Sequence, residues 1–381
     1  MSRVLLAPDK FKGTLTAAEV SAHLETGLRS VRPDLAIEVV PVSDGGDGLL
    51  EVARRLGFRT ESVVAWGPTG VPGVAAYAVR DDEAVLELAE VCGLVRLPEG
   101  RPEPETATSR GLGQVIGAAV AAGCRRILVG IGGSASTDGG AGLLRGLGAK
   151  VVDADGEPLP EGGTALLRAA ALDLSGLPDA LAETRIVVAC DVDNVLTGPG
   201  GAAAVYGPQK GADPEQVTRL DTAMAHWADL VSATVGRELR DTPGAGAAGG
   251  VGFGVYAVLG ADLRPGTELV QELTGLEAAV ARADLVVTGE GSLDHQTLHG
   301  KAPAGVAALA RASGVPVVAV AGRLLLDTET LLAAGIGTAY ALLDEAVDER
   351  EALEAPGPLL ERIGARIAAG LPGPERALDG S

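Results

Sequence analysis

The sequence is poor in cysteine, in aromatic residues and in basic residues. Its three cysteines lack the spacing of a metal-ligand motif, so we expect neither a disulfide framework nor a cysteine-bound zinc. Aromatic residues make up 2% of the chain, which argues against stacking platforms for single-stranded nucleic acid. Acidic residues number 51 against 31 basic ones, giving a formal net charge of -20. Because a phosphate backbone is held by a basic surface, the composition predicts no nucleic-acid partner.

The N-terminus shows no targeting segment. Ser2 and Arg3 are followed by a short apolar run, residues 4–7, and then by Pro8 and Asp9. This run is too short for a signal peptide or a membrane span. We therefore expect a cytoplasmic protein without a membrane partner, in a compartment that keeps its cysteines reduced. With 381 residues, the chain can form two domains or one large domain.

Lysine is rare and unevenly placed. Only five of the 31 basic residues are lysine, and four of them, Lys10, Lys12, Lys210 and Lys301, lie in short stretches rich in glycine, proline or acidic residues. A compact ammonium on a flexible stem suits a phosphate or carboxylate pocket in which a planar guanidinium does not serve. The alternative is that these lysines lie on solvated loops by chance. We favour a shared anion site.

One pattern recurs along the chain: a short apolar run, a glycine-rich loop that carries a carboxylate, and a helical stretch rich in alanine and leucine. This alternation is typical of an α/β fold with parallel strands. In the first unit, Thr16 and Glu19 have the spacing of a reciprocal cap, which predicts a helix that begins near Thr16. The predicted strands are residues 4–7, 37–42, 126–129, 186–189 and 285–288.

The pattern changes near Gly67. Residues 75–79 and 84–88 flank Asp81 and Asp82 like the two arms of a hairpin. A hairpin among parallel units indicates a second domain with a mixed sheet. The order of strand, loop and helix returns at Leu285.

Carboxylates follow the predicted strands. Asp9, Asp44, Asp138, Asp191 and Glu290 each lie within a few residues of a strand's carboxyl end, the edge at which open α/β sheets bind ligands. An aspartate beside glycine commonly makes a turn, but turns explain the whole set less well than one cleft does. Hard carboxylates with few basic neighbours suit Mg²⁺. Phosphoryl transfer combines such a metal with glycine-loop amides, lysines and a base.

Two other classes of function are alternatives. Residues 244–249 match the dinucleotide-binding fingerprint by letter, as a nicotinamide-dependent hydroxy-acid dehydrogenase would require. The preceding residues 235–243 are charged and do not resemble a strand, so the required context is missing. A non-catalytic sugar-acid-binding protein would share the cleft but has no need of so many metal-type carboxylates.

A series of short motifs resembles, in order, the bacterial glycerate kinases of the first type. The motifs are APDKFKG at 7–13, DGGDG at 44–48, GIGGSA at 130–135, CDVDNVLTGP at 190–199, GPQKGA at 207–212, TGEG at 288–291, DHQT at 294–297 and GKAP at 300–303. The resemblance extends from about residue 4 to about residue 370. It implies two α/β domains: a discontinuous flavodoxin/Rossmann-like domain with a parallel sheet, residues 1-66 plus 283-381, and an inserted domain with a mixed sheet, residues 67-282.

The resemblance also implies the activity. Members phosphorylate D-glycerate with ATP and Mg²⁺, usually at the 2-hydroxyl and less often at the 3-hydroxyl. The sequence departs from the family pattern at Asp47, Ser136, Thr137, Arg110 and Ser292. The departure at Ser292 matters most, because the family commonly has arginine there. If that arginine holds an anion, Arg323 or a nearby lysine must do so in this chain.

We assign roles within this set by chemistry. Asp191 is favoured as the base, because the neighbouring carboxylate of Asp193 raises its proton affinity. The predicted catalytic residues are Asp191, Lys12 and Asp44; the predicted metal ligands are Asp44, Asp193 and Asp138; the predicted substrate- and ATP-binding residues are Lys10, Gly45, Gly46, Gly132, Gly133, Ser134, Asn194, Lys210, Glu290, Asp294, Gln296, Lys301 and Arg323. The expected cofactors are ATP and Mg²⁺, the expected partner is D-glycerate, and a homodimer is left open.

Overall fold

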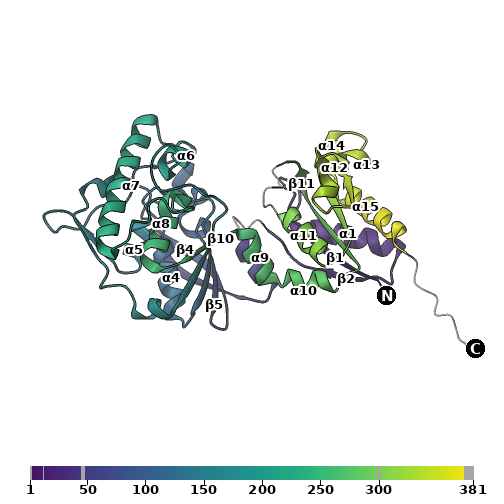
Figure 1. The fold of residues 1–381 in the computed structure, drawn as a ribbon, viewed down its shortest axis with the longest axis horizontal. Coiled ribbons are helices and arrows are strands. Elements are labelled where there is room, and N and C mark those ends of the chain that lie inside the picture. Colours follow the sequence, from purple (N-terminus) through teal and green to yellow (C-terminus); the bar gives the residue numbers. More distant parts are fainter. Residues whose placement is uncertain (1, 12, 44–47, 296, 299–301, 373–381) are drawn as a thin grey trace, which may run out of the picture. The chain divides into compact units, whose positions relative to one another are not determined.

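The computed structural model describes residues 2–11, 13–43, 48–295, 297–298 and 302–372 (Figure 1). The chain forms two compact units. Unit 1 consists of Met1–Asp44 and Thr267–Ser381, and unit 2 consists of Gly45–Gly266. Unit 2 is therefore inserted, in sequence, between the two segments of unit 1. No helix in the described part of the chain is long and apolar enough to cross a bilayer.

Unit 1 contains a five-stranded parallel sheet with the order β13-β12-β11-β1-β2. Counted within the unit, this order is 2-1-3-4-5, that of flavodoxin-like folds. The strands are β1 (Arg3–Pro8), β2 (Ala36–Val39), β11 (Leu285–Leu293), β12 (Val317–Leu324) and β13 (Thr338–Ala341). The helices are α1 (Ala17–Val31), α9 (Gly266–Thr274), α10 (Leu276–Ala281), α11 (Ala302–Ala312), α12 (Thr328–Ala333), α13 (Leu342–Glu345), α14 (Glu349–Glu354) and α15 (Pro356–Gly370).

Helices cover both faces of this sheet (Figure 1). On β1, Leu5 and Ala7 share a core with residues of α10 and α11, whereas Val4 and Leu6 share the opposite core with α1 and α15. A strand that is buried on both faces needs apolar residues at every position. The continuous apolar run at residues 4–7 has this cause, and the predicted parallel α/β fold is confirmed.

Helix α1 begins where the capping pattern predicts. Thr16 is the N-cap, and its Oγ1 accepts a hydrogen bond from Glu19 N at 3.3 Å. Glu19 Oε2 in turn accepts one from Thr16 N at 2.8 Å. These bonds favour the ionised carboxylate and lower the pKa of Glu19. The cap directs the chain from the loop after β1 into the helix.

Unit 2 contains a six-stranded mixed sheet with the order β10-β9-β6-β5-β4-β3. Strands β3, β4 and β5 are antiparallel neighbours, and the pairs from β5 to β10 are parallel. The strands are β3 (Arg59–Trp66), β4 (Pro72–Arg80), β5 (Glu83–Glu87), β6 (Arg126–Gly130), β9 (Arg185–Ala189) and β10 (Asp262–Arg264), with a separate pair β7 (Lys150–Val152) and β8 (Ala171–Asp173). The helices are α2 (Leu49–Arg55), α3 (Ala89–Cys92), α4 (Arg110–Ala121), α5 (Ala141–Gly146), α6 (Ala202–Tyr206), α7 (Pro214–Val235) and α8 (Ala247–Leu259).

The hairpin predicted around Asp81 is confirmed, since β4 and β5 pair there and Asp81 has a φ of 53° in the turn. The compact units divide at residues 44/45 and 266/267, whereas the domain boundaries near Gly67 and Ala283 stay predictions. Strand β3 pairs along its length with β4. The change of pattern near Gly67 therefore falls within an antiparallel hairpin of unit 2.

Candidate functional site

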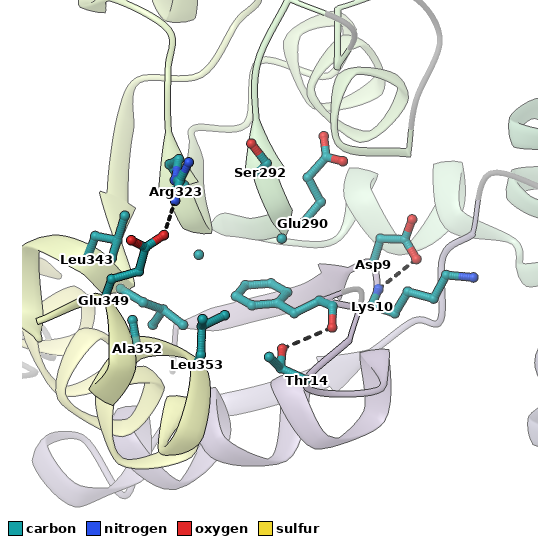
Figure 2. Close-up of a pocket in the computed structure, with 14 residues that line it drawn as sticks. Asp9, Lys10, Thr14, Glu290, Ser292, Arg323, Leu343, Glu349, Ala352 and Leu353 are labelled. Atoms are coloured by element: carbon teal, nitrogen blue, oxygen red, sulfur yellow. Dashed lines mark hydrogen bonds and ion pairs between the residues drawn. The ribbon is translucent and has the colours of Figure 1, made fainter.

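Unit 1 has a cavity of about 370 Å³ at the carboxyl ends of β1, β11 and β12 (Figure 2). Asp9 and Lys10 follow β1, Glu290 and Ser292 lie near the end of β11, and Arg323 lies near the end of β12. Strands β1 and β11 are neighbours at the point where the strand order reverses, which is the ligand site of flavodoxin-like sheets. The structure thus gathers three predicted site residues, Lys10, Glu290 and Arg323, at the edge expected from the sequence, whereas Asp294 is not among the lining residues. We call this space the unit-1 cavity.

Polar groups on the β1 side of the unit-1 cavity are joined by short hydrogen bonds. Lys10 N donates to Asp9 Oδ1 at 2.7 Å, and Asp9 N donates to Gly289 O at 2.8 Å. The Glu290 side chain is buried and accepts from Thr297 Oγ1 at 2.6 Å. Asp294 N donates to the same Thr297 oxygen at 3.0 Å. Thr297 therefore links two predicted binding residues and is one that the sequence analysis missed.

Arg323 lies on the opposite side of the unit-1 cavity from Asp9 and Lys10 (Figure 2). It forms an ion pair with Glu349 of α14, and both side chains are exposed. Its register partner in β11 is Ser292. Arg323 therefore lies on the strand beside Ser292, as a role in place of an arginine at 292 would require. That role of Arg323 stays a prediction.

Unit 2 has a cavity of about 230 Å³ at the carboxyl ends of β6 and β9. Gly132, Gly133 and Ser134 come from the loop after β6, Asp191 from the loop after β9, and Lys210 from the 3₁₀ turn Pro208–Lys210. All five are predicted site residues, brought together from three distant segments. We call this space the unit-2 cavity.

Lys210 is the most unusual residue of the unit-2 cavity, because its side chain is almost completely buried, with 2% exposed. Its Nζ donates to Ser134 Oγ at 2.7 Å and to Ser136 O at 2.5 Å. No ion pair joins it to a carboxylate of the described residues. Burial lowers the pKa of Lys210 from 10.5 to about 7, with a smaller opposing effect from the charge of Asp138.

The buried charge of Lys210 predicts a pH dependence of stability. The pKa of Lys210 is lower in the folded protein than in the unfolded chain, so between pH 7 and 10.5 the unfolded state binds the extra proton. Stability therefore rises with pH across this window, and the charge is most costly below pH 7. The melting temperature of the wild type, measured relative to that of Lys210→Met, should increase from pH 6 to pH 9. A melting-temperature difference that does not change with pH would contradict this.

The glycine-rich segment 244–254 packs against Lys210 instead of forming a dinucleotide loop. No strand precedes it, since α7 ends at Val235 and α8 begins at Ala247, so the missing context of the fingerprint is confirmed. Gly249 has a φ of +70°, and a Cβ there would lie 2.0 Å from Ser136 O and 2.8 Å from Lys210 Nζ. The glycine allows the close approach on which the position of Lys210 depends.

Asp138, a predicted metal ligand, is 1% exposed and lies inside unit 2. Its carboxylate accepts from Ser109 N and Oγ, each at 2.8 Å, from Gly140 N at 3.2 Å and from Gly142 N at 3.3 Å. Burial raises the pKa of Asp138, and the bonds from Ser109 and Gly140 oppose that rise. These contacts join the start of α4 to the turn before α5. They describe a structural role, and Asp138 is not among the residues that line the unit-2 cavity.

The loop after β9 holds the remaining predicted residues. Asp191 Oδ1 accepts from Gly266 N at 2.8 Å, and Asp193 is exposed. Asn194 fixes the loop, since its Nδ2 donates to Gly200 O at 2.9 Å and its Oδ1 accepts from Tyr206 Oη at 2.6 Å. Within the described residues, no three acidic, histidine or cysteine side chains form a metal cage. One or two carboxylates suffice for Mg²⁺ that binds together with substrate phosphates, so Asp191 and Asp193 fit such an ion.

Several predicted residues cannot be placed. Lys12, Asp44, Gly45, Gly46, Gln296 and Lys301 lie outside the described residues. The sequence analysis in turn missed Cys190, Tyr206 and Gln209, which also line the unit-2 cavity. Cys190 adjoins Asp191, which was the available signal, but a lone cysteine beside a strand is more often a packing residue.

Comparison with known proteins identifies the family of the chain. A Bacillus subtilis (strain 168) protein named "Glycerate kinase" is 42% identical over 97% of this chain and 97% of its own. An Escherichia coli (strain K12) protein named "Glycerate 2-kinase" is 39% identical over 97% of this chain and 98% of its own. A crystal structure from Salmonella typhimurium LT2, described as a putative glycerate kinase 2, is similar with a TM-score of 0.86, 40% identity and 97% of each chain covered. The sequence model of the glycerate kinase family matches residues 4–371. The chain therefore belongs to the glycerate kinase family, a family of phosphotransferases.

Proposed function

We propose that the protein transfers the γ-phosphoryl group of ATP to the 2-hydroxyl of D-glycerate, giving ADP and 2-phosphoglycerate; 3-phosphoglycerate is the less favoured product. The observation that carries this proposal is the unit-2 cavity. It combines a carboxylate, Asp191, with an ammonium, Lys210, and a glycine-rich loop at the carboxyl ends of two parallel strands. The relative from Escherichia coli, named "Glycerate 2-kinase", supports the choice of hydroxyl.

Asp191 acts as the base in this proposal. As the bond forms between the substrate hydroxyl oxygen and the γ-phosphorus, the bond from that phosphorus to the β-phosphate oxygen breaks, and the hydroxyl proton passes to the carboxylate. Phosphoryl transfer needs little covalent assistance beyond position and charge compensation. The hydrogen bond from Gly266 N holds one carboxylate oxygen of Asp191.

The unit-1 cavity suits a ligand with anionic and apolar parts. Lys10 and Arg323 supply positive charge beside the carboxylates of Asp9, Glu290 and Glu349, and an apolar wall lies next to these charged groups. ATP has both parts, which is why we assign it to residues of this cavity. The wall is formed by Phe11, Leu342, Leu343, Ala352 and Leu353.

Mg²⁺ would be held by Asp193 together with the phosphoryl group that is transferred. It would neutralise charge that develops on the phosphoryl group. The dehydrogenase alternative gains no support, because the segment 244–249 has no preceding strand. The two units as separate domains, a cytoplasmic location and a homodimer stay predictions.

An assay of the purified protein tests the proposed function. With D-glycerate, ATP and Mg²⁺, the protein should form ADP, and an excess of EDTA should abolish the reaction, because a kinase needs the metal to compensate phosphate charge. Phosphorus NMR of the product should show 2-phosphoglycerate. ADP formation at background level with D-glycerate would show that D-glycerate is not the substrate. Activity with another hydroxy acid would still support the assignment as a kinase.

A further inference from the structure

The ammonium group of Lys210 is buried, and no described residue provides it with a counter-ion. Its two hydrogen bonds go to neutral oxygens, Ser134 Oγ and Ser136 O. Asp138 is the one carboxylate with an electrostatic effect on it, and the oxygens of Asp138 are engaged by Ser109, Gly140 and Gly142. Burying a charge that lacks a partner is destabilising. A lysine that lines a cavity under these conditions indicates that a bound ligand supplies the negative charge.

Two buried hydroxyl groups near Lys210, which donates to the Ser136 carbonyl, also lack partners. Ser136 Oγ and Thr137 Oγ1 are buried and have no hydrogen-bond partner among the described residues. Buried hydroxyls are normally bonded, so unpaired ones call for an explanation such as an absent water or ligand. They adjoin the Ser136 carbonyl that accepts from Lys210. Neither residue is among the described residues that line the unit-2 cavity, so it is Lys210 that indicates a bound ligand.

The walls of the unit-2 cavity select a small anion. Among the described residues that line it, only Lys210 and Asp191 carry a formal charge. Cys190 and Tyr206 line the same cavity, and burial raises their pKa values, so they stay neutral. The cavity, at about 230 Å³, is smaller than the roughly 300–1,000 Å³ of pockets for drug-sized ligands. A three-carbon monocarboxylate fits this volume.

We infer that Lys210 binds the carboxylate of the acceptor substrate, a small 2-hydroxy acid, within the unit-2 cavity; this inference rests on the proposed function. In a 2-hydroxy acid, the reacting hydroxyl is attached to the carbon next to the carboxylate. A carboxylate held at Lys210 keeps the 2-hydroxyl in the cavity that Asp191 also lines, and it places the 3-hydroxyl one carbon farther away. The ammonium thus selects acids over neutral polyols and favours the 2-hydroxyl.

Kinetics of Lys210→Met test this inference. The KM for D-glycerate should rise about 10- to 100-fold, as expected for loss of a charged hydrogen bond in a buried site, while the KM for ATP stays within about two-fold. Lys150→Met is the matched control, because Lys150 is 70% exposed and lies 3.7 Å from Asp173; both KM values should stay unchanged. A rise in the KM for ATP with an unchanged KM for D-glycerate would overturn the inference and leave the kinase intact.

A measurement on the wild type keeps the inference testable if Lys210→Met does not fold. The chain has only five lysines, so protein labelled with ¹³C at lysine Cε gives few signals. D-Glycerate without ATP should shift the Lys210 signal, and glycerol, which lacks the carboxylate, should not. A Lys210 signal that does not shift with D-glycerate, or that shifts equally with glycerol, would overturn the inference. A wild type that neither binds nor phosphorylates D-glycerate would refute the proposed function before any variant is compared.

Discussion

Replacing Asp191 by asparagine should lower kcat by roughly 100-fold or more, the size typical of losing a general base. The amide keeps the shape of the side chain and can still accept the 2.8 Å hydrogen bond from Gly266 N, but it cannot take the hydroxyl proton. Both KM values should change little, because the interaction is needed in the transition state. Steady-state kinetics at saturating Mg²⁺ measure the effect, with circular dichroism to verify the fold.

Asp193→Asn is the matched control, since Asp193 is exposed two residues farther along the same loop. As a metal ligand it should raise the Mg²⁺ concentration needed for half-maximal activity and spare kcat at saturating Mg²⁺. Full kcat in Asp191→Asn would instead shift the role of base to Asp44. The engaged and buried carboxylate of Asp138 makes it a poor substitute.

Asp138→Ala should destabilise unit 2 severely, by about 3–5 kcal/mol, as is usual when one partner of a buried charged network is removed. The change leaves Ser109 N, Gly140 N and Gly142 N without their acceptor in a site that water does not reach. Urea unfolding followed by circular dichroism measures the loss. Activity should fall in proportion to the fraction of folded protein.

The control is Asp155→Ala, an exposed turn residue of the same unit, whose stability should match that of the wild type. If Asp138 were a metal ligand, its replacement would leave the midpoint of urea unfolding unchanged and raise the Mg²⁺ requirement. That result would contradict the structural role described above.

The order of the elements is readable from local pattern. A strand buried on both faces must be apolar throughout, and a helix end needs a cap. For this reason residues 4–7 and Thr16 locate β1 and the start of α1 within a residue or two. The extent of each compact unit cannot be read from one segment of sequence. Strand β3 belongs to unit 2 because it pairs with β4, and Gly67 lies between these two strands.

The carboxylates show the same division. Asp138 and Asp191 look alike in the sequence, since each follows a predicted strand by a few residues. Ser109, 29 residues before Asp138 along the chain, converts it into a buried acceptor, whereas Asp191 stays at the surface of a cavity. Sequence pattern cannot separate them, because exposure depends on which distant segment packs against the turn.

The sequence by itself determined the α/β class, the strands and their glycine-rich loops, the family, and the short set of residues from which a site could be built. Each follows from residue type and spacing along one segment. Only the tertiary structure decided that Lys210 is buried with no counter-ion from the described residues, that Ser292 and Arg323 are neighbours, and that Asp138 lies inside unit 2. Burial and charge pairing are properties of segments that fold together, and no one segment encodes them.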